Sequence, residues 1–166
     1  FNVRHLFNNI GEALQQSFFQ VGSIITTTGY ATTDYNQWPA VSRTILILLT
    51  FCGACAGSTG GGIKISRLLL LAKSVRKELH LYLHPNAVKK IKMDGKAVSH
   101  EVMRATNIYM IVYLMIMAVS IFIISFDEFD LVTNFTAVAT TLNIVGPGLS
   151  LIGPTGNFGI FSPLSK

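Results

Sequence analysis

Residues Ala105 to Phe126 read ATNIYMIVYLMIMAVSIFIISF and carry no charged side chain. At about 1.5 Å of rise per residue, a helix of about 22 residues crosses a hydrocarbon core of about 30 Å. Over the whole 166-residue chain, 50% of the residues are hydrophobic and 13% are charged, against roughly 25% charged in an average soluble domain. The stretch lies deep in the chain, so we do not expect a signal peptide. The sequence therefore predicts an all-α membrane protein.

Basic residues cluster before this helix. All but three of the 13 Lys and Arg residues lie between Lys64 and Arg104. The positive-inside rule predicts that residues 76–104 face the cytoplasm. A nucleic-acid-binding function is not expected, because the basic segment is a short loop between apolar segments and not part of a soluble fold. The acidic residues outside the segment are expected on the external side, where negative charge concentrates cations: Glu12, Asp34, Asp127, Glu128 and Asp130.

The segment after the long helix is apolar but too short to cross a membrane. Leu131 to Asn143 is rich in Thr and Ala and leads into Val145-Gly-Pro-Gly148, which cannot continue a helix. Because the preceding helix carries the chain outward, this segment is predicted to dip into the membrane and return to the same side. Non-helical backbone at that depth must line a watery cavity or be buried in protein.

The N-terminal part repeats this pattern. Asn9 and Glu12 have the spacing of a capping box, and Ala13 to Thr26 forms a second short apolar segment. A polar turn follows, Asp34-Tyr-Asn-Gln-Trp-Pro39, whose aromatic residues suit the membrane interface. When Gly29 is aligned with Gly146, further positions match: Phe18 with Phe135, Val21 with Val138 and Ser23 with Thr140. We interpret the two segments as copies of one hairpin.

The end of each short helix is a candidate ion-binding segment. Rings of backbone carbonyls replace the water shell of a cation without placing a full charge in the membrane. The first copy ends in Thr27, Thr28, Gly29 and Tyr30, which resembles the Thr-Val-Gly-Tyr part of potassium-channel filters. The counterpart in the second copy is Ile144, Val145 and Gly146. These seven residues are predicted to bind potassium through their backbone in an extended selectivity filter.

A third apolar segment begins at Ala40 and runs inward toward Arg76. Each glycine lowers helix propensity by about 1 kcal/mol relative to alanine, so Gly53, Gly57 and the run from Gly60 to Gly62 should interrupt this helix. The run is not a phosphate-binding loop, because Ile63 separates its lysine from the last glycine. Close helix packing through small residues is the alternative interpretation.

Two further pairs of residues have the spacing of chemical sites. Cys52 and Cys55 have redox-like spacing, but their flanks are apolar, which favours small buried thiols. His80 and His84 have helical spacing but no third ligand nearby, so we expect a solvated pair.

Several motifs together resemble the TrkH family, which shares a superfamily with KtrB and the plant HKT transporters. They are Thr26-Thr-Thr-Gly-Tyr30, Trp38-Pro39, Cys55-Ala-Gly-Ser-Thr-Gly-Gly-Gly-Ile-Lys64, His84-Pro-Asn-Ala-Val88 and Leu142-Asn-Ile-Val-Gly-Pro-Gly148. The resemblance implies four unequal units of helix, re-entrant pore loop and helix in one polypeptide. Residues 1–80 would form the third unit, 81–100 a cytoplasmic linker, and 101–166 the fourth unit without its last helix. The first two units and the opening helix of the third would be missing.

The same resemblance implies the function and the partners. The chain would belong to a multi-pass protein of the cytoplasmic (inner) membrane that takes up potassium, with no enzyme activity, no organic cofactor and no metal other than the transported ion. An intramembrane loop below the filter, formed by Gly57, Ser58, Thr59, Gly60, Gly61 and Gly62, would gate the pore. Partners would be the lipid bilayer, the remaining units, a second copy in a homodimer and a cytosolic TrkA-type nucleotide-binding subunit.

Two alternatives stay open at this point. A subunit of a tetrameric potassium channel would carry one hairpin per chain, whereas this chain carries two unlike ones. An intramembrane thiol redox protein would use Cys52 and Cys55 and would need polar residues beside the sulfur atoms.

Overall fold

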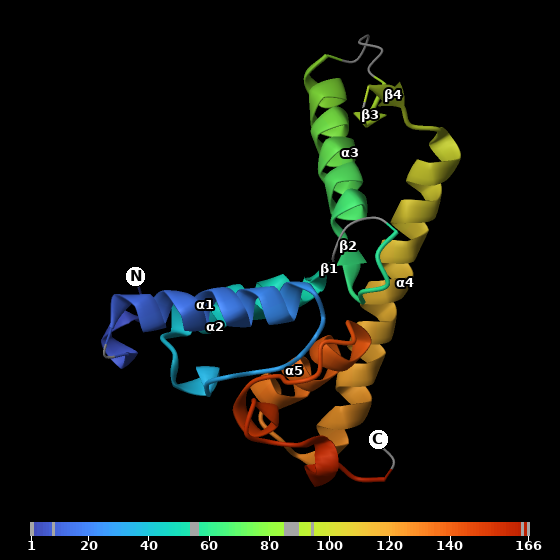
Figure 1. The fold of residues 1–166 in the computed structure, drawn as a ribbon. Coiled ribbons are helices and arrows are strands. Elements are labelled where there is room, and N and C mark those ends of the chain that lie inside the picture. The colour runs from blue at the N-terminus through green and yellow to red at the C-terminus, as the bar shows by residue number, and fades with distance from the viewer. Residues whose placement is uncertain are drawn as a thin grey trace.

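The computed structural model describes residues 2–7, 9–53, 57–84, 90–93, 95–163 and 165. This part of the chain is mainly helical (Figure 1). The helices are α1 (Ile10–Ile25), α2 (Ala40–Phe51), α3 (Ile65–Leu83), α4 (His100–Ile124) and α5 (Leu131–Leu142). Single 3-10 turns lie at Arg4–Leu6, Tyr35–Gln37, Ser125–Asp127, Ser150–Ile152 and Phe158–Ile160.

Two very short sheets complete the fold. β1 (Cys52–Gly53) pairs in parallel with β2 (Ile63–Lys64). The residues before and after the glycine-rich segment therefore lie side by side. β3 (Lys92–Met93) and β4 (Lys96–Ala97) form an antiparallel hairpin between α3 and α4. In Figure 1, α3 and α4 extend toward that hairpin, while α1 lies over α2 and α5 lies beside α4.

The long apolar helix is where the sequence predicts it. Within the described residues, only His100–Asp127, with 28 residues, is long and apolar enough to cross a membrane. Ser99 begins α4 by accepting a hydrogen bond from the Val102 amide. Most of its apolar side chains are exposed, and Thr106 and Tyr113 are its buried residues. This exposure fits a helix that faces lipid or other helices.

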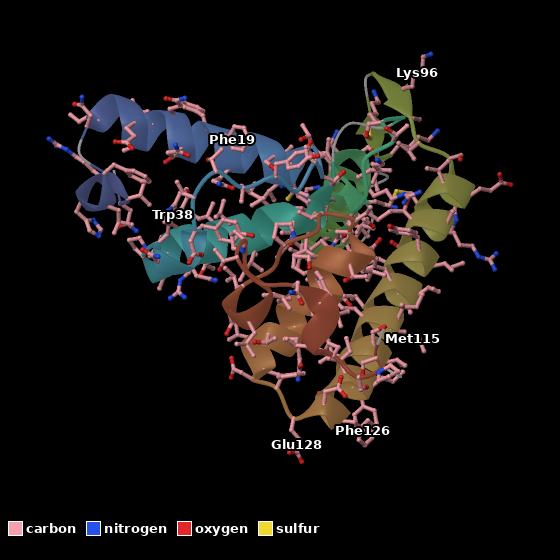
Figure 2. All side chains as sticks on the ribbon, turned by 60° about the horizontal axis from the view of Figure 1, so that its bottom comes forward. Phe19, Trp38, Lys96, Met115, Phe126 and Glu128 are labelled. Carbon is pink, nitrogen blue, oxygen red and sulfur yellow. The ribbon has the colours of Figure 1, made fainter. Side chains whose placement is uncertain are left out.

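The two ends of α4 carry opposite charges. Lys96 lies near its first residue, and Glu128 and Phe126 lie at its far end (Figure 2). These are the charges from which the cytoplasmic and external sides are predicted.

The inward helix is interrupted, as the glycines predict. α2 ends at Phe51 and α3 begins at Ile65, with the β1–β2 pair between them. Asn9 is the N-cap residue of α1, as its position predicts, but its side chain makes no capping hydrogen bond. Tyr35 and Trp38 are 3% and 5% exposed and pack in the core, so protein covers most of their surface.

That core joins the two hairpins. It contains Ile24 from the end of α1, Trp38 from the following turn, and Val145 and Leu149 from the segment after α5. Because lipid is as apolar as these side chains, close packing between the segments, and not removal from water, stabilises the part of this core that lies in the membrane. A smaller cluster of Ala137, Ile152 and Phe161 packs the C-terminal segment against α5.

Candidate functional site

Helix α1 ends in a tight turn. The Thr27 amide donates to the Ile24 carbonyl at 3.0 Å, and the Thr28 amide donates to the Ser23 carbonyl at 2.9 Å. These two bonds define a Schellman cap, whose left-handed residue is usually glycine. Here that residue is Thr27, with φ of 55°.

Helix α5 ends in the same turn. The Ile144 amide donates to Thr141 at 3.1 Å, the Val145 amide donates to Thr140 at 2.9 Å, and φ of Ile144 is 56°. The bonding pattern and the left-handed residue fall at the positions that the internal alignment pairs. The two helix ends thus have the same backbone geometry at equivalent positions, which is the geometry expected of two copies of one hairpin.

Both turns hold a side chain in a conformation that L-residues resist. A left-handed non-glycine residue costs roughly 1–2 kcal/mol, and a β-branched residue such as Ile144 or Thr27 is especially unusual there. Such strain persists only where the surroundings enforce it, and it clusters at functional sites. The same cost in both copies marks the two turns as the first candidate site.

The glycines that follow bring the two turns into contact. Gly29 has φ of 76°, and Gly146 has φ of 112°. A Cβ atom on Gly29 would lie 2.0 Å from the Val145 carbonyl oxygen, and one on Gly146 would lie 3.9 Å from the Gly29 Cα atom. Gly29 is therefore required for both its backbone angle and the close approach.

The chain beyond Gly29 is held against α1. The Ser23 hydroxyl donates to the Tyr30 carbonyl at 2.6 Å. The buried Gln20 side chain donates to the Thr32 hydroxyl at 3.4 Å, and this hydroxyl in turn donates to Gln16. These contacts keep the returning segment beside the helix instead of letting it fold away.

A clamp joins the two hairpins at their outer ends. The Asn36 side chain donates to the Ser150 carbonyl at 3.2 Å and accepts from the Ser150 amide at 3.0 Å. Asp34 holds the turn that carries Asn36 by accepting from the Asn36 amide at 3.0 Å. Burial, together with the nearby Asp34 carboxylate, raises the pKa of Tyr35 well above its usual range. Sequence reasoning did not find Asn36, because its partner lies 114 positions away.

The glycine-rich loop lies directly against both turns. A Cβ atom on Gly61 would lie 2.0 Å from the Asn143 carbonyl oxygen, and the Gly61 amide donates to the Thr27 hydroxyl at 3.4 Å. Figure 1 shows α1 and α5 ending near the β1–β2 pair that flanks the loop. The loop thus contacts the start of both filter-like turns.

Lys64 closes this loop from its own end. Its ammonium group donates to the Ser58 carbonyl at 2.9 Å, to the Ser58 hydroxyl at 3.0 Å and to the Gly60 carbonyl. A lysine that binds three oxygens of its own loop is not available for phosphate. This agrees with the spacing argument against a phosphate-binding loop.

Asn143 connects the glycine-rich loop, the turn that ends α5, and α4. Its side chain is completely buried, donates to the Ala139 carbonyl at 2.7 Å, and accepts from the Tyr113 hydroxyl at 2.9 Å. Its Oδ1 atom also lies 3.3 Å from where a Cβ on Gly62 would be. Neither Tyr113 nor Asn143 was singled out from the sequence, since a tyrosine within an apolar helix gives no sign of its partner.

This chain is similar to proteins of a known family. The family model for TrkH, described as a cation transport protein, matches residues 5–165. This chain belongs to the TrkH family. That family description is of a transport protein and not of an enzyme.

Individual relatives and a solved structure are also similar to this chain. The Trk system potassium uptake protein TrkH of Salmonella typhimurium is 38% identical over 164 residues, covering 96% of this chain and 34% of the relative. TrkG of Escherichia coli, also a Trk system potassium uptake protein, is 34% identical over 90% of this chain and 30% of its own length. The crystal structure of the potassium transporter TrkH from Vibrio parahaemolyticus superposes with a TM-score of 0.83 at 37% identity, covering 93% of this chain and 33% of that chain. The chain therefore spans about a third of the length of these TrkH relatives.

The remaining candidate residues that the structure describes do not assemble into a second site. Cys52 is a half-buried free thiol in β1, and Cys55 lies outside the described residues. The His80 and His84 rings are 5.0 Å apart on α3. Among the residues that the structure of this TrkH chain describes, no group of three or more His, Cys, Asp or Glu side chains forms a metal site.

The Tyr113–Asn143 bond leads to a first prediction. Tyr113→Phe removes the donor and leaves the buried Asn143 oxygen without a partner, which costs about 1–3 kcal/mol. We expect the free energy of unfolding of the full-length protein to fall by about that amount, measured by denaturant unfolding in detergent. Tyr109→Phe is the matched control, since in the described part of the chain that hydroxyl makes no hydrogen bond and the Arg67 guanidinium lies over the ring, 3.9 Å from its centroid. Equal effects of the two changes would contradict a role for the hydrogen bond.

Proposed function

We propose that this chain forms half of a potassium-conducting pore in a TrkH transporter of the cytoplasmic membrane. The ion would be bound by backbone carbonyls of Thr27, Thr28, Gly29 and Tyr30 from one hairpin and of Ile144, Val145 and Gly146 from the other. The observation that carries the proposal is the pair of identical strained turns that meet at Gly29 and Gly146. The names of the relatives as potassium uptake proteins support potassium as the ion.

Physical chemistry supports a cation at this place. The last carbonyls of α1 and α5 point along their helices toward the turns, and they are the negative ends of the helix dipoles. Carbonyls can replace the water shell of potassium while no full charge is buried in the membrane. Two hairpins supply only half of a carbonyl ring, so the remaining units of the same polypeptide would complete the pore.

The glycine-rich loop is proposed as the gate. Residues Gly57, Ser58, Thr59, Gly60, Gly61 and Gly62 form a segment that touches the base of both turns through Gly61. Lys64 fixes one end of the loop, and the small residues leave the backbone free to change its angles. Movement of such a segment away from Asn143 and Thr27 would open a path below the filter.

The proposal includes a membrane topology and partners. Residues 1–80 and 101–166 would be the third and fourth pore units, joined by the cytoplasmic linker 81–100, in a multi-pass inner-membrane protein. The transporter would act as a homodimer on a cytosolic TrkA-type nucleotide-binding subunit, with no organic cofactor on this chain.

Site-directed labelling tests the topology. In a full-length protein with Cys52 and Cys55 changed to alanine, single cysteines at Lys90 and Asp34 should react with impermeant thiol reagents from opposite sides of the membrane. We expect Lys90→Cys to label only in inside-out vesicles and Asp34→Cys only in right-side-out cells. Labelling of both from one side would reject the re-entrant topology.

Transport by the full-length protein tests the function itself. Its expression in bacteria that lack potassium uptake systems should restore growth at low external potassium, and purified protein in liposomes should pass potassium in preference to sodium. Growth restored without any potassium flux in liposomes, or no flux of either ion, would refute the proposal.

A further inference from the structure

A small cavity lies at the end of α3 that approaches the cytoplasmic linker. Its volume is about 130 Å³, and five of its six lining residues are basic: Lys73, Arg76, Lys77, Lys90, Ile91 and Lys92. The gating and filter residues lie elsewhere in the chain, so the proposed function does not use this cavity.

The cavity is built from two separate segments. Lys73, Arg76 and Lys77 share one face of α3 because their spacing is three and four residues. The Lys73 ammonium donates to the Lys92 carbonyl at 2.8 Å and ties the second segment to the helix. The Val98 amide donates to the Ile91 carbonyl at 2.9 Å, which extends the β3–β4 pairing to this wall.

Among the described residues, which do not include Asp94, no acidic side chain forms an ion pair with this cluster. In the described part of the chain none of the five basic residues forms an ion pair, and neither does Glu78, which follows Lys77 in the sequence. Like charges gathered around one cavity repel each other, so a bound anion would stabilise the arrangement. An Arg beside several Lys residues suits phosphate, which accepts several charge-assisted hydrogen bonds at once.

Apolar side chains lead to this cavity along the same helix. Leu69 lies one turn before Lys73 and is 45% exposed, and Ile65 lies one turn further and is 51% exposed. An anionic phospholipid has matching chemistry, with a phosphate at the surface and acyl chains below it. Basic residues at the cytoplasmic end of membrane helices attract anionic lipid at about 1 kcal/mol each.

We propose that this basic cavity binds a phosphate group, supplied by the headgroup of an anionic lipid of the cytoplasmic leaflet or by a free phosphate compound. Arg76 and Lys77 provide the charge, and Lys73 positions the second wall through Lys92. The cytoplasmic position of residues 76–104, which the labelling experiment tests separately, places the cavity at that leaflet.

The test uses two double variants of the full-length protein. Arg76→Gln with Lys77→Gln removes two charges from the cavity and keeps the Lys73 contact. The control, Lys96→Gln with Arg104→Gln, removes one Lys and one Arg from exposed positions outside it. Both change the net charge equally, so diffuse attraction affects them alike.

Binding of two probes to the purified protein is measured at fixed salt: a short-chain phosphatidylglycerol and inorganic phosphate. We expect the wild type to bind at least one probe, the cavity variant to bind it at least tenfold more weakly, and the control to stay within twofold. Binding of phosphatidylglycerol alone assigns the site to lipid, and equal competition by inorganic phosphate assigns it to a free phosphate compound.

Three outcomes would overturn the proposal. They are no binding of either probe, equal losses in both double variants, and loss of a cytosolic protein partner in the cavity variant without any phosphate binding. Thermal unfolding of each variant, compared with wild type, separates these results from misfolding.

Discussion

Gly29→Ser in the full-length transporter should lower the preference for potassium over sodium by roughly tenfold, or abolish transport. The residue has φ of 76°, and its Cβ would lie 2.0 Å from the Val145 carbonyl oxygen. A side chain in that conformation costs on the order of 1–2 kcal/mol, and 1.4 kcal/mol is a factor of about ten in an equilibrium. The contact with Val145 adds a displacement of the other hairpin. Potassium and sodium flux in liposomes measure the effect.

Gly146→Ser should act in the same direction but more weakly. Its φ of 112° is also unsuited to a side chain, but a Cβ there would lie 3.9 Å from its nearest neighbour, the Gly29 Cα. Gly95→Ser is the matched control, since φ is 78° and no atom lies within 4 Å of the added Cβ. Gly153 is unsuitable as a control, because its Cβ would lie 2.1 Å from the Asn36 amide nitrogen of the clamp. Wild-type ion ratios in both filter variants would refute the filter.

Gly61→Ala should change the rate of potassium transport by about tenfold while leaving the ion preference near wild type. The added methyl group would lie 2.0 Å from the Asn143 carbonyl oxygen and 3.1 Å from the Ile144 Cβ, so the loop backbone must move away from the turn that ends α5. A shift against rigid backbone costs on the order of 1–3 kcal/mol, the range for overpacked sites. Neither filter glycine is altered, which is why the rate should respond before selectivity.

Gly22→Ala provides the comparison for this change. It lies within α1, where no atom is within 4 Å of the added methyl group, and alanine favours the helix. We expect near-wild-type flux from this variant. If Gly61→Ala also left both rate and ion ratio unchanged, close packing through small residues would explain the glycine run better than a gate.

Much of the helical layout follows from local sequence. The uncharged stretch from Ala105 predicts the long helix, and the glycines from Gly53 to Gly62 lie in the break between α2 and α3, because hydropathy and helix propensity act over neighbouring residues. The alignment of Gly29 with Gly146 predicted equivalent segments after α1 and α5, but the left-handed Thr27 and Ile144 differ from the extended backbone expected there. Local sequence was enough to predict the helices and the break, since each depends on residues close in sequence.

The side chains of Asn9 and Trp38 show what local sequence leaves undecided. Asn9 has the residue type and spacing of a cap, but spacing does not determine whether the side chain turns toward the helix. Trp38 is amphipathic and suits an interface, yet packing against Ile24, Val145 and Leu149 buries it more completely. Propensity is overridden wherever a second segment supplies a better environment.

By itself, the sequence of this protein determined its class, its helix lengths, the two copies of the hairpin and the break between α2 and α3. Only the tertiary structure decided how these parts meet: Gly29 against Val145, Gly61 against Asn143, and Asn36 around Ser150. Such contacts join residues as much as 114 positions apart. Local propensities do not encode the distance between segments that far apart, whereas close packing in the folded chain does, because a single added carbon atom at Gly29 or Gly61 would clash.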